Sequence, residues 1–342
     1  MTTPSVDSVN AWLLAGEPWI VMRTQLDLLG ASPSCGEVRQ ARGAMLQDTQ
    51  VVSLFRLISD AWSREIVTSH RKADLGCHRA AFLADIGVTA EDAMGAELVR
   101  MLLDRLSPEG VPQVSICIPA HFGGSGETVA GWALCDAPSI LATVLSMGGP
   151  PAPLRDKVED GIRHLLSYVG PEGCPCAVSE GYGRFRGPGR KEDPCPYATL
   201  LMLKLLIRLP EDFRTDGPSV GERMARCADA LLGLWEASRE RHPYLFHMGT
   251  DFRRLKAPFV WYDLLHVADT LSRCPTAVQD ARFRDMARHL LDMADPEGRF
   301  TPQSVWKAWD GWEFGQKKQP SRWITLLAHR VAVRAGMDRP GR

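Results

Sequence analysis

The chain has 342 residues, of which 45% are hydrophobic and 24% are charged, and its formal net charge is −1. This composition is typical of a folded globular protein and excludes a disordered or membrane-embedded chain. The near-zero charge gives no general attraction to nucleic acid or to an anionic membrane.

The first 105 residues are predicted to form divergent helical hairpins. Helix-period apolar patterns occur in SVNAWLLAGEPWIVMRTQLDLLG, in DTQVVSLFRLISDAW and in DLGCHRAAFLADIGV. The apolar run near the N-terminus lacks a basic leader and is interrupted by Gly16, Glu17 and Pro18, so it does not have the pattern of a secretory signal. No run reaches the roughly 20 apolar residues of a membrane span. We therefore interpret the protein as cytoplasmic, with its nine cysteines as reduced thiols or metal ligands.

A repeat of about sixty residues follows. LVRMLLDRLSPEG, GIRHLLSYVGPEG and MARHLLDMADPEG are amphipathic helical patterns that end in Pro-Glu-Gly at Gly110, Gly173 and Gly298. These turns lie 63 and 125 residues apart, about one and two periods. Proline and glycine together predict that each helix stops there.

After each turn and an irregular loop, a second and more apolar helix is predicted. These helices begin near Cys135, Cys195, Trp261 and Trp323, and their apolar residues on all sides predict burial. Pairs of one amphipathic and one buried helix, without strand-like alternation, indicate an all-α fold, an α/α toroid whose inner helices line a cavity. We predict one domain over 1–342, with clear repeats over 106–342. An open α-solenoid is the structural alternative.

The segment GPGRKEDPCPYATLLML, starting at Gly187, carries a family resemblance. Its basic Pro-Gly loop, acidic residue and aromatic-containing helix, together with the Pro-Glu-Gly turns, resemble the repeats of protein prenyltransferase β-subunits and squalene-type cyclases. The resemblance covers about residues 110–334. It implies a pocket where the inner helices start, zinc that activates a thiol, and basic residues that hold a diphosphate. By position, Asp193 and Cys195 match the family's acidic residue and zinc-binding histidine, and Cys135-Asp136 stands where the family has an Asp-x-Cys pair.

Four cysteines form the candidate metal centre. Cys135, Cys174, Cys176 and Cys195 lie at or near the starts of successive predicted inner helices, which a toroid would bring together. Thiolates suit zinc, which takes four tetrahedral ligands. Two other interpretations stay open: small buried residues in turns, or one reactive thiolate at a helix N-terminus.

Three residues are candidate catalytic groups. Asp136 starts its helix, where a carboxylate either caps backbone N–H groups or does acid–base work. Asp263 and His266 lie with Tyr262 in WYDLLHV, and the spacing of four predicts that Tyr262 and His266 share a helix face. Such a set could orient a ligand or transfer a proton, and the alternative is a core histidine bonded to its own aspartate.

Basic loops and aromatic residues are the candidate ligand contacts. Arginine forks match phosphate or carboxylate oxygens, and large aromatics give a pocket an apolar wall. Solvated loops and a packed surface helix are the alternatives. The candidate substrate-binding residues are Arg184, Arg186, Arg190, Tyr197, Trp261, Tyr262 and Trp306.

The leading functional hypothesis is a prenyltransferase- or cyclase-like protein that binds a small molecule with an apolar part and an anionic group, with a Cys-rich zinc centre. No nucleic-acid partner is expected. One alternative is a binding or scaffold protein that keeps the fold without catalysis. Another is a toroid lyase of acidic sugars, with Tyr262, His266 and arginines around an open groove.

Overall fold

The computed structural model describes residues 6–176, 179–185, 194–238, 240 and 251–341. The chain forms two compact units, one made of residues 1–54 and 250–342 and the other of residues 55–249. We call them unit 1 and unit 2. Unit 1 combines both ends of the chain, and the single domain over 1–342 stays a prediction.

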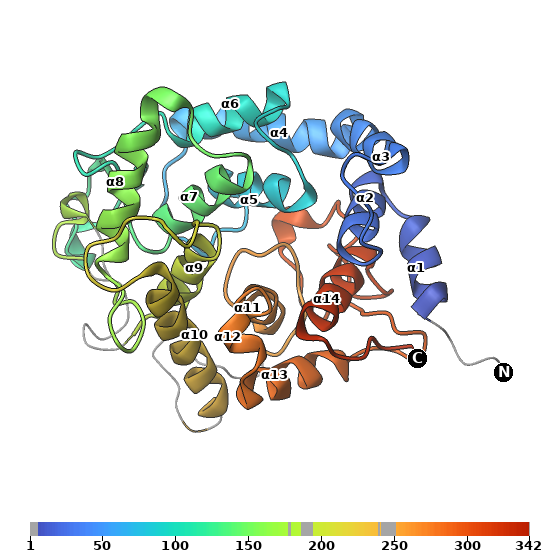
Figure 1. Ribbon diagram of the computed structural model, residues 1–342. Coiled ribbons are helices and arrows are strands. Elements are labelled where there is room, and N and C mark those ends of the chain that lie inside the picture. Colours follow the sequence, from blue (N-terminus) through green and yellow to red (C-terminus); the bar gives the residue numbers. More distant parts are fainter. Residues whose placement is uncertain (1–5, 177–178, 186–193, 239, 241–250, 342) are drawn as a thin grey trace. The chain divides into compact units, whose positions relative to one another are not determined.

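Unit 1 is built from helices at the two ends of the sequence (Figure 1). Helix α2 packs against α1, α3 and α14, and α14 also packs against α11 and α13. The first and last helices therefore share one core. The helices are α1 (Val6–Leu14), α2 (Pro18–Asp27), α3 (Gly36–Gln47), the start of α4 (Thr49–Ala61), α11 (Leu264–Leu271), α12 (Pro275–Val278), α13 (Ala281–Leu291) and α14 (Arg322–Ala335), with a 3-10 turn at Lys307–Trp309.

Unit 2 is built around successive helices that pack side by side. Helix α7 lies between α5 and α9, and α9 packs against α10. The helices are α5 (Gly76–Ile86), α6 (Ala93–Leu102), α7 (Ala137–Ser146), α8 (Arg155–Leu166), α9 (Pro196–Leu206) and α10 (Val220–Glu236). Short 3-10 turns lie at Trp62–Arg64, Ala120–Phe122, Ala152–Leu154 and Glu180–Tyr182.

The predicted difference between first and second helices is confirmed. All eleven residues of α9 and all eight of α11 are buried, because their sequences are apolar on nearly every side. The first helix α13 buries only five residues, which recur at helical spacing on one face. The all-α class is also confirmed in its coarse form, since the chain is mostly helical, whereas closure into a toroid stays a prediction.

The Pro-Glu-Gly turns adopt the backbone that their glycines predict. Gly110, Gly173 and Gly298 have φ of +87°, +101° and +75°, in the left-handed region that only glycine enters without strain. A Cβ on Gly173 would lie 2.8 Å from Thr199 Oγ1, which accepts a hydrogen bond from the Cys174 backbone N–H. The turn that ends the second repeat therefore also positions the loop that carries Cys174.

Replacing Gly173 with alanine is expected to lower the free energy of unfolding by about 1 to 3 kcal/mol, because backbone strain and the contact with Thr199 add. Urea denaturation measures the loss. Gly217→Ala is the matched control, since Gly217 has φ +81° and an added Cβ would meet nothing within 4 Å. Equal losses in both variants would show that only the backbone conformation matters.

One element departs from the predicted pattern. Val114–Cys117 (β1) and Thr128–Gly131 (β2) pair as an antiparallel hairpin between α6 and α7. In β1, Val114 and Ile116 are buried while Ser115 and Cys117 are partly exposed, which is the alternation of a half-buried strand. The expectation of no strand-like alternation was therefore wrong at this loop.

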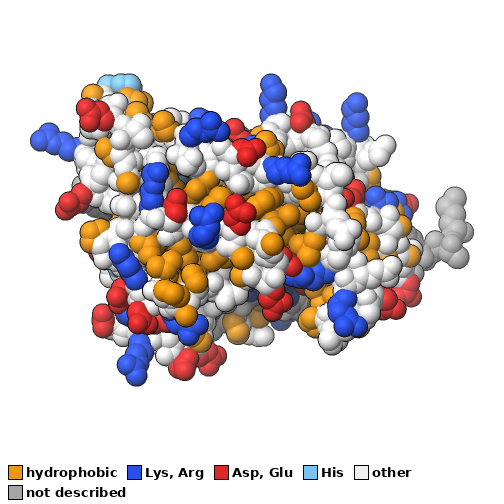
Figure 2. All heavy atoms as spheres, turned by 90° about the horizontal axis from the view of Figure 1, so that it is seen from above, with side chains coloured by type: hydrophobic (Ala, Val, Ile, Leu, Met, Phe, Trp, Pro, Cys, Tyr) orange, Lys and Arg blue, Asp and Glu red, His pale blue; other side chains and the backbone are white. Residues whose placement is uncertain are grey.

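The surface has the mixed character that the composition predicts. On the face shown in Figure 2, basic and acidic side chains are interspersed among hydrophobic ones, in keeping with the net charge of −1. Among the described residues, no helix combines the length and the apolar character that crossing a membrane requires.

Candidate active site

Asp136 is the centre of a buried polar group in unit 2. It is 2% exposed and precedes α7, but its carboxylate does not cap that helix. Oδ2 lies 2.7 Å from His70 Nε2 and 3.5 Å from the Tyr182 hydroxyl, while Oδ1 accepts the Ala133 backbone N–H at 2.9 Å. The capping role considered for Asp136 is therefore excluded, and the carboxylate instead collects three donors.

Both the ring and the backbone carbonyl of His70 have hydrogen-bond partners. Its ring bonds Asp136, and its carbonyl lies 2.9 Å from His78 Nε2, a ring nitrogen on α5. Burial lowers the pKa of His78 to about 4, so His78 is neutral near pH 7 and can donate to this carbonyl. The His70 side chain is 17% exposed, so part of the imidazole faces solvent while Asp136 does not.

Two tyrosines lie near the same carboxylate. The Tyr182 hydroxyl also lies 3.5 Å from His70 Nε2, and its ring stacks on Phe185. Burial, then the Asp136 charge, raises the pKa of Tyr182, so its hydroxyl stays a donor. Tyr197, in the first turn of α9, is 1% exposed, and burial followed by Cys135, Cys77 and Asp136 raises its pKa.

The thiols beside this group are paired. The Cys135 and Cys195 thiols interact, and this mutual hydrogen bonding raises the pKa of Cys135 and lowers that of Cys195. Cys195 is the N-cap of α9 and its sulfur also accepts the Ala198 backbone N–H at 3.5 Å. Donors around one sulfur favour its thiolate, so Cys195 is the more acidic thiol of the pair.

The other predicted metal ligands lie close by. Cys174 is buried and hydrogen bonds the thiol of Cys227 on α10, and the half-buried Cys176 is near enough to raise the pKa of Cys135. In the part of the chain that the structure describes, no three His, Cys, Asp or Glu side chains are arranged to hold a metal ion. Zinc binding by these cysteines stays a prediction.

A surface hollow lies beside the N-terminus of α5. Its lining includes Trp62, Glu65 and Arg105. The Glu65 carboxylate caps α5 through the Gly76 backbone N–H at 2.9 Å. After burial, Glu65 and Asp136 are the charges that raise the pKa of Cys77, so Cys77 lies near both the hollow and the acid–base group.

In unit 1, the candidate residues Tyr262, Asp263 and His266 do not share one helix face as predicted. Helix α11 starts at Leu264, so Tyr262 precedes the helix and does not share a helical face with His266. Asp263 is the N-cap, and its Oδ1 accepts the His266 backbone N–H at 3.1 Å. His266 is 0% exposed; its Nδ1 lies 2.8 Å from the Trp261 carbonyl oxygen, and its ring stacks on Phe259. His266 is a core histidine whose ring is held by the Trp261 carbonyl, while its own aspartate accepts its backbone N–H.

The candidate aromatic contacts of unit 1 pack within their own loops. Tyr262 is buried against Phe252. Trp306 is half-buried, donates to the Pro258 carbonyl at 3.2 Å and lies under the ammonium of Lys256. Tyr262 and His266 are both buried, so they do not line the open groove that a lyase would need.

The basic residues predicted in unit 2 are only partly described. Arg184 is exposed, and its backbone N–H bonds the Gly123 carbonyl at 3.0 Å. Arg186 and Arg190 lie outside the described residues. Arg184 nevertheless follows Tyr182 by only two residues, so it lies close in the chain to the acid–base group.

Sequence reasoning missed His70 and Tyr182. His70 lies in TSHRKAD, which has no helical period, and Tyr182 lies in an irregular loop. One signal was available: His70 precedes a buried helix, α5, as Asp136 precedes α7, and the two residues are 66 positions apart.

The arrangement can transfer a proton. A carboxylate that accepts the Nε2 proton of a histidine leaves Nδ1 as a base and stabilises the imidazolium that forms. Comparison with known proteins adds no assignment: no protein-family model matches the chain, and no curated protein sequence matches it.

Proposed function

We propose that this protein is a transferase or cyclase of the prenyltransferase and squalene-cyclase type, acting on a small amphiphilic molecule, with His70 as its general base. The observation that supports this proposal is the Asp136 carboxylate, which is buried and bonds His70 and Tyr182 instead of capping α7. A buried carboxylate that orients a partly exposed imidazole is a common arrangement for proton transfer.

In the proposed reaction, His70 Nδ1 takes a proton from a thiol or hydroxyl of the substrate. Asp136 holds the ring through Nε2 and stabilises its positive charge. Tyr182 remains protonated and donates to the carboxylate, which keeps Oδ2 in place. Cys195, the more acidic thiol of its pair, is the candidate nucleophile or zinc ligand of the same centre.

The substrate class follows from the family resemblance and the basic loop. An anionic group would meet Arg184, which is exposed two residues beyond Tyr182. The apolar part would lie against aromatic and aliphatic side chains. A prenyl diphosphate has both features, so we take it as the first substrate to test.

The test is release of diphosphate from a prenyl diphosphate, with and without a thiol acceptor. His70→Gln and Asp136→Asn are each expected to lower kcat by about 100-fold, because loss of a general base costs at least that much. His121→Gln is the control, since His121 is exposed and its ring lies on Phe122. Turnover that is unchanged in His70→Gln would overturn the assignment of the base.

A non-catalytic binding protein is the second candidate. It is favoured by the thiol pairs Cys135–Cys195 and Cys174–Cys227, which satisfy one another as packed core groups do. This candidate predicts saturable binding of the prenyl diphosphate without turnover, and equal affinity in the wild type and in His70→Gln.

A further inference from the structure

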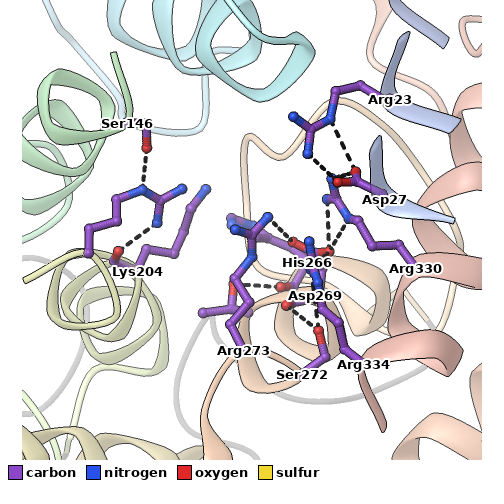
Figure 3. Close-up of polar contacts among 12 residues, drawn as sticks. Arg23, Asp27, Ser146, Lys204, His266, Asp269, Ser272, Arg273, Arg330 and Arg334 are labelled. Carbon is purple, nitrogen blue, oxygen red and sulfur yellow. Dashed lines mark hydrogen bonds and ion pairs between the residues drawn. The ribbon is translucent and has the colours of Figure 1, made fainter. Parts of the chain in front are cut away.

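Unit 1 contains a cluster of four arginines and two aspartates at the C-terminal ends of α2, α11 and α14 (Figure 3). Asp27 is the last residue of α2 and Asp269 lies in α11. We call the six residues the arginine cluster; its arginines are Arg23, Arg273, Arg330 and Arg334. None of them belongs to the acid–base group in unit 2.

Arg330 is the structural centre of the cluster. Its side chain is 2% exposed, and it bonds Asp269 Oδ1 at 2.8 Å and Asp27 Oδ2 at 3.2 Å. Arg23 bonds Asp27 from one turn earlier in α2. These contacts join α2, α11 and α14. The ion-pair partners of Arg330 and Asp27 all belong to the cluster.

Arg273 and Arg334 keep unused donors. The Arg273 guanidinium approaches Asp269 only to 3.7 Å, beyond hydrogen-bond distance, and makes no hydrogen bond to a described residue. Arg334 uses Nη1 alone, toward Asp269 and Ser272, which leaves Nε and Nη2 without a partner among the described residues. Their side chains are 32% and 22% exposed, so these donors are reachable from solvent.

The charges of the cluster do not cancel within it. Four guanidinium groups meet two carboxylates, which leaves +2. The ends of three helices contribute roughly −0.5 each at most, and this partial charge is screened and falls off within a turn. Helix ends can therefore offset part of the excess, but they supply no acceptor for the free donors of Arg273.

We infer that Arg273 and Arg334, positioned by Asp269, bind an oxyanion of the phosphate class. Planar guanidinium forks match phosphate oxygens, and a dianion would balance the excess charge. The anion is either free phosphate or the phosphate head of a larger molecule. Burial and the neighbouring Arg330 and Arg273 lower the pKa of Arg334 to about 9, in keeping with an unbalanced cationic cluster.

The experiment is isothermal titration of the full chain with inorganic phosphate, inorganic diphosphate and an alkyl phosphate at constant low ionic strength. We expect one saturable site. Arg273→Gln and Arg334→Gln should each weaken binding by about tenfold or more, the equivalent of one charge-assisted hydrogen bond. Both variants retain the buried ion pair between Asp269 and Arg330, so both should fold. Arg282→Gln is the control, because Arg282 is 27% exposed and pairs with Asp280 elsewhere in unit 1.

The outcomes separate the possible ligands. Tight binding of inorganic phosphate would identify a site for the free ion. Preference for the alkyl phosphate, lost in Arg273→Gln, would identify a head-group site. Absence of saturable binding in the wild type, or equal affinity in the wild type and Arg273→Gln, would overturn the proposal and leave helix ends as the partners of the excess charge.

Discussion

Replacement of Asp269 by asparagine is expected to lower the free energy of unfolding by about 3 to 5 kcal/mol, because it removes one partner of a buried ion pair. Arg330 is 1% exposed and would keep its charge beside a neutral amide. Asp27 would remain as its only carboxylate partner within the arginine cluster. The measurement is urea denaturation at pH 7, with Asp310→Asn, an exposed site in the same unit, as control. A loss of about 1 kcal/mol or less would show that the pair behaves like a surface salt bridge.

The pH dependence of Asp269 has a definite sign. Burial alone would raise its pKa, but Arg330, Arg273 and Arg334 together lower it below the ordinary 3.8. A carboxyl with a lowered folded-state pKa contributes stability above its unfolded pKa and loses it as the pH falls through the folded value. Wild-type stability should therefore decline below about pH 4, and Asp269→Asn should lack this part of the decline.

Asp263→Asn is expected to have the opposite effect and to stabilise the protein at pH 8. Burial raises the pKa of Asp263 to about 7, with Lys256 only partly opposing it, and Oδ2 has no hydrogen-bond partner among the described residues. Above pH 7 the wild type must bury a poorly paired carboxylate. A pKa about 3 above its ordinary value corresponds to a cost of up to about 4 kcal/mol. Asparagine is neutral and can still cap α11 through its amide oxygen.

The direction of the Asp263 pKa shift determines the pH range in which the two proteins should differ in stability. A carboxyl with a raised folded-state pKa contributes its stability below the unfolded value of 3.8 and loses it as the pH rises through about 7. Unfolding free energies of wild type and Asp263→Asn should therefore coincide near pH 4 and diverge by pH 8. If the variant is instead less stable at pH 8, the carboxylate is used in its charged form, with Lys256 as its partner.

The two aspartates show what sequence reasoning could not distinguish. Both lie in or next to α11, six residues apart, and both are buried. Asp269 meets arginines from α14, whereas Asp263 meets backbone N–H groups of its own helix. Only the helices packed around α11 make one a charged ion-pair partner and the other a carboxyl of raised pKa.

The candidate active site was likewise only partly predictable from the sequence. Asp136 was singled out because it starts a predicted inner helix, and the four candidate metal ligands, Cys135, Cys174, Cys176 and Cys195, were expected to converge from successive repeats. His70 and Tyr182 were not found, because their contacts with Asp136 span 66 and 46 residues and leave no local pattern. The interpretation of Tyr262 and His266 as one helix face was wrong because Asp263 caps α11 after Tyr262.

The sequence by itself determined most of the helices, the Pro-Glu-Gly turns and the burial of the second helices. Helical period, apolar content and the Pro-Glu-Gly turns act over a few residues, so their structural meaning can be deduced without a fold. The tertiary structure decided the acid–base group, the arginine cluster and the assembly of unit 1 from both chain ends. These depend on side chains that meet across long sequence separations, and burial then sets their charge and hydrogen bonding.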